Sequence, residues 1–290
     1  MSPQITTAFV EQYSSNVSML AQQMGSKLRG AVDVETIRGK NAFFDQIGAT
    51  AAVVRSTRHG ATPQIDTPHS RRRVSLADYE WADLIDDLDK VRMLTDPTSN
   101  YAKAAAAAMN RSIDDVIITA LNASADTGVA GGTAVALPSS SKFATSDQSD
   151  GLTVAKLLQS KYFLDNGNVD PSIKRYFVCG PKQIQDLLNT TEVKSSDYNT
   201  VKALAQGSIN SFLGFEFIMS TRLNMDGTHT DDRLCFAFTQ DAVKLAIGAD
   251  VKAKITERDD KSYATQVYYS MALGATRMEE EKVFQVPCDE

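Results

Sequence analysis

Few side chains of this chain have the types and spacing that catalysis or metal binding requires. The three histidines, His59, His69 and His229, all lie in polar segments rich in turn-forming residues. A Ser-His-Asp triad or a zinc site needs a histidine that is held in a cleft beside its partners. We therefore interpret all three as solvated loop residues.

Two groups of carboxylates also deserve consideration as cation or proton sites. Asp226, Asp231 and Asp232 surround His229, but their spacing is not that of a calcium loop and no bidentate acid follows at position twelve. Turn chemistry is the better explanation. The second group is more typical of a solvated acidic face, and it consists of Asp86, Asp87 and Asp89.

The short motifs of nucleotide-binding and hydrolytic enzymes are absent from the sequence. We find no GxxxxGK[ST], no HExxH and no GxSxG. The glycine cluster Gly128–Gly132 lacks a following Lys-Ser/Thr pair and a preceding buried strand, so we interpret it as a loop. The sequence favours a protein that is not an enzyme and needs no metal or cofactor. The alternative from another class is a cytosolic α/β enzyme that uses Asp226–Asp232 with His229.

The cysteines and the apolar runs indicate the cellular compartment in which the chain is made. Cys179, Cys235 and Cys288 form no CxxC pair, and two of them sit inside apolar, strand-like runs. Buried thiols in a reducing compartment are the expected state. The first ten residues lack the features of a signal peptide, and no apolar run approaches the roughly 20 residues that span a bilayer. We expect a cytosolic site of synthesis and no membrane association.

Charge limits the classes of partner. The chain has 36 acidic and 30 basic residues among 290, and its formal net charge is −6. A dedicated nucleic-acid binder is normally basic. The composition therefore argues against tight nucleic-acid binding, although it is compatible with a protein that encloses nucleic acid without gripping it.

One run of like charges has an opposite counterpart far along the chain. Arg71, Arg72 and Arg73 follow one another, and Glu279–Glu281 is the obvious acidic block. Contact of the arginines with nucleic acid is one interpretation, but no aromatic residues are interleaved with them. We favour an ion-pair surface that faces another subunit, with the two blocks pairing between subunits as the hypothesis.

The most regular segment of the sequence predicts a long helix from Asp96 to about Ala125. Asp96 followed by Pro97 is the order expected for an N-cap and a first helical residue. Apolar residues then return at intervals of three and four, which places them on one helix face: Ala102, Ala105, Met109, Ile113, Val116, Ile117, Ala120 and Leu121. A helix of roughly 40 Å suggests a spine on which other segments lean.

The front of the chain looks unable to fold alone. Residues 1–48 contain a helix-like piece, Phe9–Lys27, but no self-contained core. The next segment predicts a long hairpin, with an outgoing strand at Ala51–Thr57, a polar tip, and returning strands at Arg71–Leu76 and Tyr79–Leu84. A two-stranded ribbon is marginal in water, so it must lie on a partner surface.

The remaining segments alternate between helix and strand patterns, which indicates an α+β protein. Residues 126–150 are rich in Gly, Ser, Thr and Ala and predict a mobile loop. We expect helices at 152–164 and 181–189, and a helix-like piece at 241–247. The expected strands are 175–179, 212–219, 234–238, 251–257, 263–273 and 282–286.

The order of these parts resembles the tailed-phage major capsid protein of the Hong Kong 97-like fold. No single motif carries the resemblance, which covers nearly the whole chain and includes these segments: Asn110–Asp115, Gly214–Ile218, Ala242–Ala246, Asp259–Tyr263 and Gly274–Arg277. It implies an N-terminal arm at 1–48, an E-loop hairpin at 49–90, and a peripheral domain with the spine helix at 91–164. An axial domain would follow at 165–232, and the C-terminal strands of the peripheral domain at 233–290.

The resemblance also implies the function and the partners. The subunits would form pentamers and hexamers of an icosahedral head that encloses double-stranded DNA, assembled in the host bacterial cytoplasm and found in the virion. Arg58 on the hairpin joins the two charge blocks as a candidate subunit contact. A portal, a separate scaffolding protein and a cement or decoration protein are the further partners implied. The alternative within the same fold is an encapsulin-like compartment.

One departure from the family pattern concerns covalent linkage. Some relatives join an E-loop lysine to an asparagine of the next subunit, but Thr50–Asp89 contains no lysine. We therefore expect a shell that is held together without covalent bonds.

Overall fold

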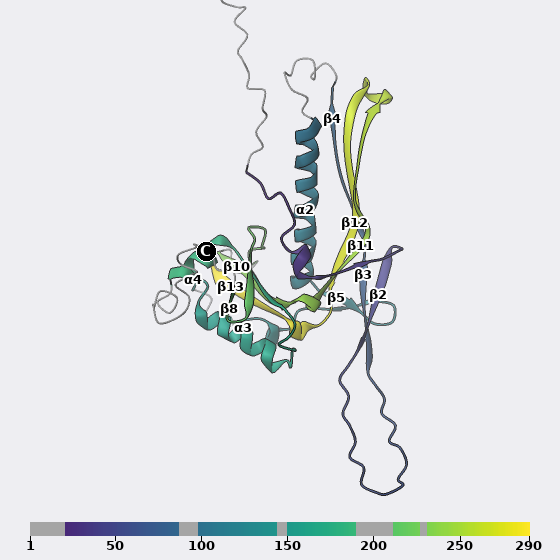
Figure 1. The fold of residues 1–290 in the computed structure, drawn as a ribbon, viewed down its shortest axis with the longest axis vertical. Helices are drawn as coiled ribbons and strands as arrows, with labels where there is room; N and C mark the ends of the chain where they lie inside the picture. The colour runs from purple at the N-terminus through teal and green to yellow at the C-terminus, as the bar shows by residue number, and fades with distance from the viewer. Residues whose placement is uncertain (1–20, 87–97, 144–149, 190–210, 227–230) are drawn as a thin grey trace, which may run out of the picture. The chain divides into compact units, whose positions relative to one another are not determined.

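The computed structural model describes residues 21–86, 98–143, 150–189, 211–226 and 231–290 (Figure 1). Its Cα positions divide into two compact units. Unit 1 comprises Met1–Ser26, Asp78–Ser112 and Ala249–Ala272, and unit 2 comprises Lys27–Ala77, Ile113–Gly248 and Leu273–Glu290. Both helices and sheets are present, which confirms the α+β class.

The long helix is confirmed as α2, Thr98–Asn122. Its 25 residues correspond to about 38 Å at the usual rise per residue. Met109, Ile113, Ile117 and Leu121 are spaced by four and are at most 3% exposed, so the apolar stripe of the sequence is the buried face. Asp96 and Pro97, the expected cap residues, lie outside the described residues.

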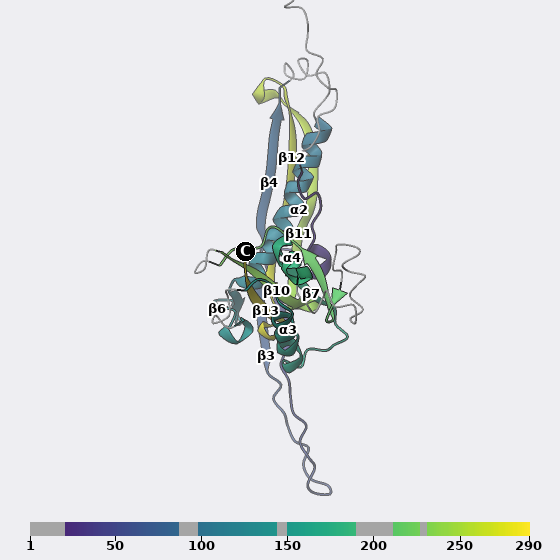
Figure 2. The same cartoon turned by 90° about the vertical axis from the view of Figure 1, so that its left-hand side faces the viewer.

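Unit 1 is built on a twisted set of long strands beside the first part of α2 (Figure 2). Strands β11, Val243–Arg258, and β12, Ala264–Arg277, are joined by the turn η6, Asp259–Lys261, and β4, Ala77–Ile85, pairs on the other side of β12. This confirms the strands expected at 251–257 and 263–273. On β4, Glu80 accepts a hydrogen bond from the Tyr268 hydroxyl at 2.9 Å.

Unit 2 contains a five-stranded sheet in the order β13-β10-β7-β9-β8. Strand β7, Arg175–Cys179, is buried along its whole length because it runs between β10, Asp232–Thr239, and β9, Phe215–Met219. The edges are β13, Val283–Asp289, and β8, Ser211–Phe212. The expected strand at 212–219 is therefore two strands.

Three helical segments alternate with these strands along the chain. Helix α3, Val154–Asn166, and helix α4, Pro181–Asn189, confirm the two expected helices. The expected helix-like piece at 241–247 is wrong, because only the single turn η5, Gln240–Ala242, is helical before β11 begins. Strand β1, Asp33–Thr36, pairs in parallel with residues 244–247 of β11, which explains the extended backbone there.

A second sheet of unit 2 has the order β2-β3-β5-β6. Its hairpin joins β2, Asn41–Ile47, to β3, His69–Ser75, in a register that pairs Asn41 with Ser75 and Ile47 with His69. The outgoing strand is thus β2 and not the expected Ala51–Thr57, since residues 49–68 have no strand partner and are all exposed. Part of the expected 126–150 loop also forms strands: β5, Ala125–Thr127, and β6, Thr133–Val135.

Two further expectations concern the front of the chain and the membrane. Most of the helix expected at Phe9–Lys27 lies outside the described residues, and residues 21–27 are not helical. Among the helices that the structure describes, none combines the length and apolar character needed to cross a bilayer.

Candidate subunit-contact site at the base of the hairpin

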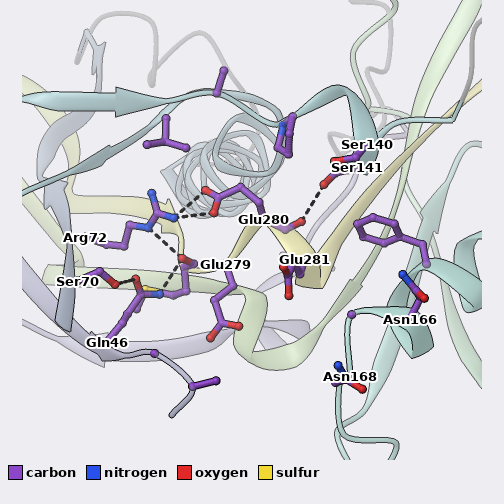
Figure 3. Close-up of a pocket in the computed structure, with 18 of the residues that line it drawn as sticks. Gln46, Ser70, Arg72, Ser140, Ser141, Asn166, Asn168, Glu279, Glu280 and Glu281 are labelled. Carbon is purple, nitrogen blue, oxygen red and sulfur yellow. Dashed lines mark hydrogen bonds and ion pairs between the residues drawn. The ribbon is translucent and has the colours of Figure 1, made fainter. Parts of the chain in front are cut away.

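A cavity of about 900 Å³ lies at the base of the β2–β3 hairpin in unit 2 (Figure 3). One wall is the end of the hairpin, with Gln46, Ile47 and Ser70. The opposite walls come from the single turn η3, Ser139–Ser141, the end of α3 and the turn η7, Glu280–Lys282. The cavity collects four of the predicted contact residues in one place, namely Arg72, Glu279, Glu280 and Glu281.

Hydrogen bonds between distant segments shape the cavity wall. Gln46 donates from Nε2 to the Met278 carbonyl oxygen at 2.7 Å, and its Oε1 accepts from the Ser70 hydroxyl at 3.0 Å. Across the cavity, the Ser141 hydroxyl donates to the Glu280 carbonyl oxygen at 3.2 Å. Hydrogen bonds therefore join the hairpin base to the segment that leads into η7. On the other side of the cavity, η3 is bonded to η7.

Arg72 and Glu280 form an ion pair within one chain. Arg72 donates from Nη2 to both carboxylate oxygens of Glu280 at 2.7 Å and from Nε to the Met278 carbonyl oxygen at 2.9 Å. The residue is only 7% exposed. Arg277 Nε also lies 3.7 Å from the Glu280 carboxylate. Arg72 and Glu280 are therefore paired inside the chain, and pairing of the two charge blocks between subunits stays a prediction.

The neighbouring arginines also pair within unit 2. Arg71 donates from Nε to Asp45 Oδ1 at 2.5 Å and from Nη2 to Asp45 Oδ2 at 3.3 Å, and this hydrogen-bonded guanidinium holds the pKa of Asp45 below its ordinary value. Arg73 donates from Nη2 to Asp126 Oδ2 at 2.7 Å. Alternation along β3 thus turns Arg72 inward and its two neighbours to the other face. A subunit contact for Arg71 and Arg73 stays a prediction.

The remaining predicted contact residues are exposed. Glu279 lies 3.1 Å from Lys282 Nζ, while Glu281 has no ion pair with a residue that the structure describes. Arg58 lies in the exposed turn at the far end of the hairpin, and it has no ion pair within the described parts of the chain either. Glu281 and Arg58 are therefore two exposed opposite charges that pair with no residue in the described part of unit 2. Their role in a subunit contact stays a prediction.

Among the residues that the structure describes, the other types considered for chemistry do not assemble into a site. His59 and His69 are exposed, and His229 lies outside the described residues. The Asp226 backbone N–H donates a hydrogen bond to the Asp232 carbonyl oxygen at 2.7 Å. Within the described ranges, no group of three His, Cys, Asp or Glu side chains could hold a metal ion.

The glycine and cysteine interpretations are confirmed by the local structure. Gly128 and Gly131 occupy left-handed conformations, φ 95° and 64°, in the turn between β5 and β6. All three cysteines are free thiols and fully buried. Burial raises the pKa of Cys179 to about 12, so this thiol is unreactive at neutral pH. Of the expected acidic face, Asp86 is exposed, and Asp87 and Asp89 lie outside the described residues.

Comparison with known proteins decides the family. A family model described as phage capsid protein matches residues 5–290. The chain belongs to the phage capsid protein family. It is therefore a structural protein of the virion shell, and this recognition agrees with the resemblance seen in the sequence.

Solved phage structures share the fold of this capsid protein. The capsid protein of cyanophage Pam1 superposes with a TM-score of 0.76 at 13% identity, covering 98% of this chain and 97% of that one. The capsid protein of cyanophage P-SCSP1u superposes with a TM-score of 0.73 at 16% sequence identity, covering 97% of this chain and 93% of that one. A chain of Mycobacterium phage Che8 superposes with a TM-score of 0.70 at 17% sequence identity, covering 96% of this chain and 97% of that one. No curated protein matches the chain. The fold is Hong Kong 97-like.

This capsid protein also contains an anchor that sequence reasoning missed. Asp114 of α2 is fully buried, and its carboxylate accepts hydrogen bonds from the backbone N–H groups of Lys27 and Leu28 at 3.1 Å. Local spacing gave little signal, because Asn110 and Arg111 lie four and three residues before Asp114, next to it on the helix surface. A buried carboxylate needs donors, and the backbone of Lys27 and Leu28 supplies them.

A second residue that sequence reasoning missed caps the C-terminal end of α2. Arg277 is fully buried and donates from Nη1 to the carbonyl oxygens of Leu121 and Ala123 at 3.1 and 2.8 Å, and from Nη2 to that of Val135 at 3.0 Å. A guanidinium satisfies the carbonyl groups that every helix end leaves without partners. Arg277 belongs to the Gly274–Arg277 segment that contributed to the family resemblance, but its task could not be derived from that segment alone.

Proposed function

We propose that this phage capsid protein is the major subunit of the icosahedral head of a tailed phage. In this proposal it assembles into pentamers and hexamers that together enclose double-stranded DNA. The observation that carries the proposal is the hairpin beyond β2 and β3, whose residues 49–68 are all exposed in the isolated chain.

An isolated ribbon of this kind cannot stabilise itself. Apolar side chains stabilise a fold only when they are removed from water. Four of them in this hairpin are well exposed: Ile47 at 71%, Val53 at 59%, Val54 at 89% and Ile65 at 45%. Two-stranded ribbons become stable when they lie on another surface. A neighbouring subunit is that surface, so the hairpin is ordered by assembly and assembly is stabilised by the hairpin.

Closed symmetry follows from the same geometry. A hairpin that reaches from one subunit to a different patch of the next makes a heterologous contact, and such contacts generate rings when the rotation closes. Rings of five and six copies are the closed units of an icosahedral shell in this proposal. Each contact can be weak, since many contacts per subunit add through multivalency.

The charge of the chain suits a container better than a DNA-binding protein. With a net charge of −6, contact with the phosphate backbone is loose, salt-dependent and without base readout. A portal, a separate scaffolding protein and a cement or decoration protein complete the proposed set of partners. The proposed place of assembly is the host bacterial cytoplasm.

Sedimentation of the expressed protein, followed by electron microscopy, tests this function. We expect rings and particles of megadalton mass when a scaffolding protein is supplied, and nuclease-protected double-stranded DNA in particles taken from a phage lysate. Particles that contain protein cargo and no DNA would favour the encapsulin-like alternative. A small oligomer under all conditions would contradict the proposal.

A further inference from the structure

We propose that the cavity at the hairpin base receives the hairpin tip of a second copy of this chain, and that Arg58 of that tip pairs with Glu281 at the cavity rim. The inference rests on the proposed function and names the receiving surface, which neither the family match nor the fold specifies. It follows from four observations: the opposite charges of the tip and the rim, the apolar lining of the cavity, the volume of the cavity and the length of the ribbon.

The tip carries the positive charge. Between residues 49 and 68 the charged residues are Arg55, Arg58 and Asp66, which leaves an excess of one positive charge. Arg58 lies in the turn at the end of the ribbon, and its side chain is exposed. Arg55 donates from Nε to the Thr57 carbonyl oxygen at 3.0 Å, which stabilises the turn that presents Arg58.

The rim of the cavity carries the negative charge. Glu280 is used by Arg72, and Glu279 is shared with Lys282, whereas Glu281 is exposed and has no ion pair among the described residues. Opposite charges on separate patches of one chain favour the approach of two copies in a single orientation. The pair proposed between Arg58 and Glu281 therefore fixes the direction of the contact.

The cavity also offers apolar surface. Ile47, Phe163 and Met278 contribute to its lining, and Ile47 is 71% exposed in the free chain. Val53 and Val54 of an entering tip would cover this surface and lose their own exposure to water. A volume of about 900 Å³ is at the upper end of ordinary ligand cavities, so it can accept a turn of a few residues.

The reach of the ribbon requires that the tip come from another copy. The ribbon begins at the cavity itself, since Ile47 and Gly48 are part of the lining, and it extends away from the cavity (Figures 1 and 2). Ten residues separate Gly48 from Arg58, which corresponds to about 33 to 36 Å of extended chain. The tip therefore lies far from its own cavity, and repeating the step from tip to cavity produces a ring.

Cross-linking of a double-cysteine chain tests the contact directly. The native thiols are buried, so Arg58→Cys and Glu281→Cys place the only exposed thiols at the tip and the rim. A short bismaleimide added to assembled particles should then give a ladder of covalent oligomers in denaturing electrophoresis, up to a closed ring. The matched control pairs Arg58→Cys with Glu257→Cys, an exposed position of β11 in unit 1, and should give no ladder. Particles that form normally but give no ladder with the first pair would overturn this inference and leave the proposed function standing.

Charge reversal supplies a second readout. Arg58→Glu should lower the assembled fraction about fivefold or more, because each copy replaces an attraction by a repulsion at a repeated contact. Adding Glu281→Arg should restore assembly, whereas adding Glu257→Arg, which changes the net charge equally, should not. Equal rescue by both substitutions would mean that net charge alone matters, and it would overturn the pairing.

Discussion

Arg72 and Glu280 are separated by 208 positions in the sequence, yet the guanidinium donates to both carboxylate oxygens at 2.7 Å. The pair joins strand β3 of the hairpin to the turn η7 before the last strand. Because Arg72 is almost completely buried, solvent screens the Arg72–Glu280 ion pair only weakly, and this pair holds the hairpin base. The exposed ribbon therefore extends from a fixed base.

Replacing Arg72 by Met should destabilise the chain markedly. The substitution removes the Nη2 group that donates to both Glu280 oxygens in a partly desolvated site, so we expect a loss of about 2–4 kcal/mol in the free energy of unfolding. Urea unfolding followed by circular dichroism measures it. Arg71→Met is the matched control, and its effect should be much smaller because both partners of the Arg71–Asp45 pair are exposed. Equal effects of the two substitutions would contradict this role of Arg72.

Gly274 should not tolerate a side chain. A Cβ built on it would lie 2.3 Å from the Ser75 carbonyl oxygen, which is a backbone atom that cannot move aside. Gly274→Ala should therefore separate β12 from the end of β3 and cost about 1–3 kcal/mol in thermal or urea unfolding. Gly30→Ala serves as control, since its Cβ would meet nothing within 4 Å. A neutral Gly274→Ala would show that the two strands do not approach so closely.

Asp114 should hold the arm segment that begins at Lys27. Asp114→Ala removes the acceptor of the Lys27 and Leu28 N–H groups, so this segment should open more often. Trypsin cleavage after Lys27 or Arg29 should become about tenfold faster, or more, while the rest of the chain stays folded. Asp115→Ala, which removes only the ion pair with Arg222, should not accelerate cleavage there. Unchanged cleavage in Asp114→Ala would contradict the anchor.

The pair of Asp241 with Lys282 predicts a pH dependence. Burial alone would raise the pKa of Asp241, but hydrogen bonds from Lys282 Nζ at 2.6 Å and the Thr239 hydroxyl at 2.7 Å outweigh it and lower the pKa. A carboxyl whose folded pKa is lowered stabilises the native state above the unfolded value of about 3.9, and this contribution is lost as the pH falls through the folded value.

Asp241→Asn should therefore unfold at lower urea concentration near neutral pH, and the difference from the unsubstituted chain should shrink as the pH falls below about 4. Urea unfolding at a series of pH values measures that difference. Asp259→Asn, in the exposed turn η6, should follow the unsubstituted chain throughout. A difference that stays constant down to low pH would rule out this ion pair as its source.

The absence of lysine from Thr50–Asp89 predicts a shell without covalent cross-links. Mature particles boiled in detergent should give a single band at the mass of the monomer. Reduction should not change the pattern, because the three thiols are buried. Covalent ladders from untreated particles would refute this prediction.

Elements bounded by strong local signals could be predicted from the sequence almost to the residue. Strand Arg175–Cys179 is an apolar run that ends at Gly180, and Pro181 then starts the helix that follows. The long helix was predicted because its apolar spacing persists over many turns. The identity of the family followed from the order of such elements.

Contacts between distant segments could not be predicted in the same way. Local spacing at 241–247 resembles a helix, but pairing with β1 imposes an extended backbone. The hairpin partner β2 was overlooked because the adjacent Phe43 and Phe44 break the simple alternation of a strand. The signs of the two charge blocks were evident, but register alone turns Arg72 inward toward Glu280 and keeps that pair inside the chain.

Amide hydrogen exchange of residues 49–68, measured on dispersed subunits and again on assembled particles, tests the central claim most directly. The account predicts exchange within seconds in the dispersed state, because this segment is exposed and unpaired with any described strand, and strong protection once neighbouring copies cover it. Protection that is already complete in the dispersed subunit, or exchange that is equally fast in the particle, would contradict it.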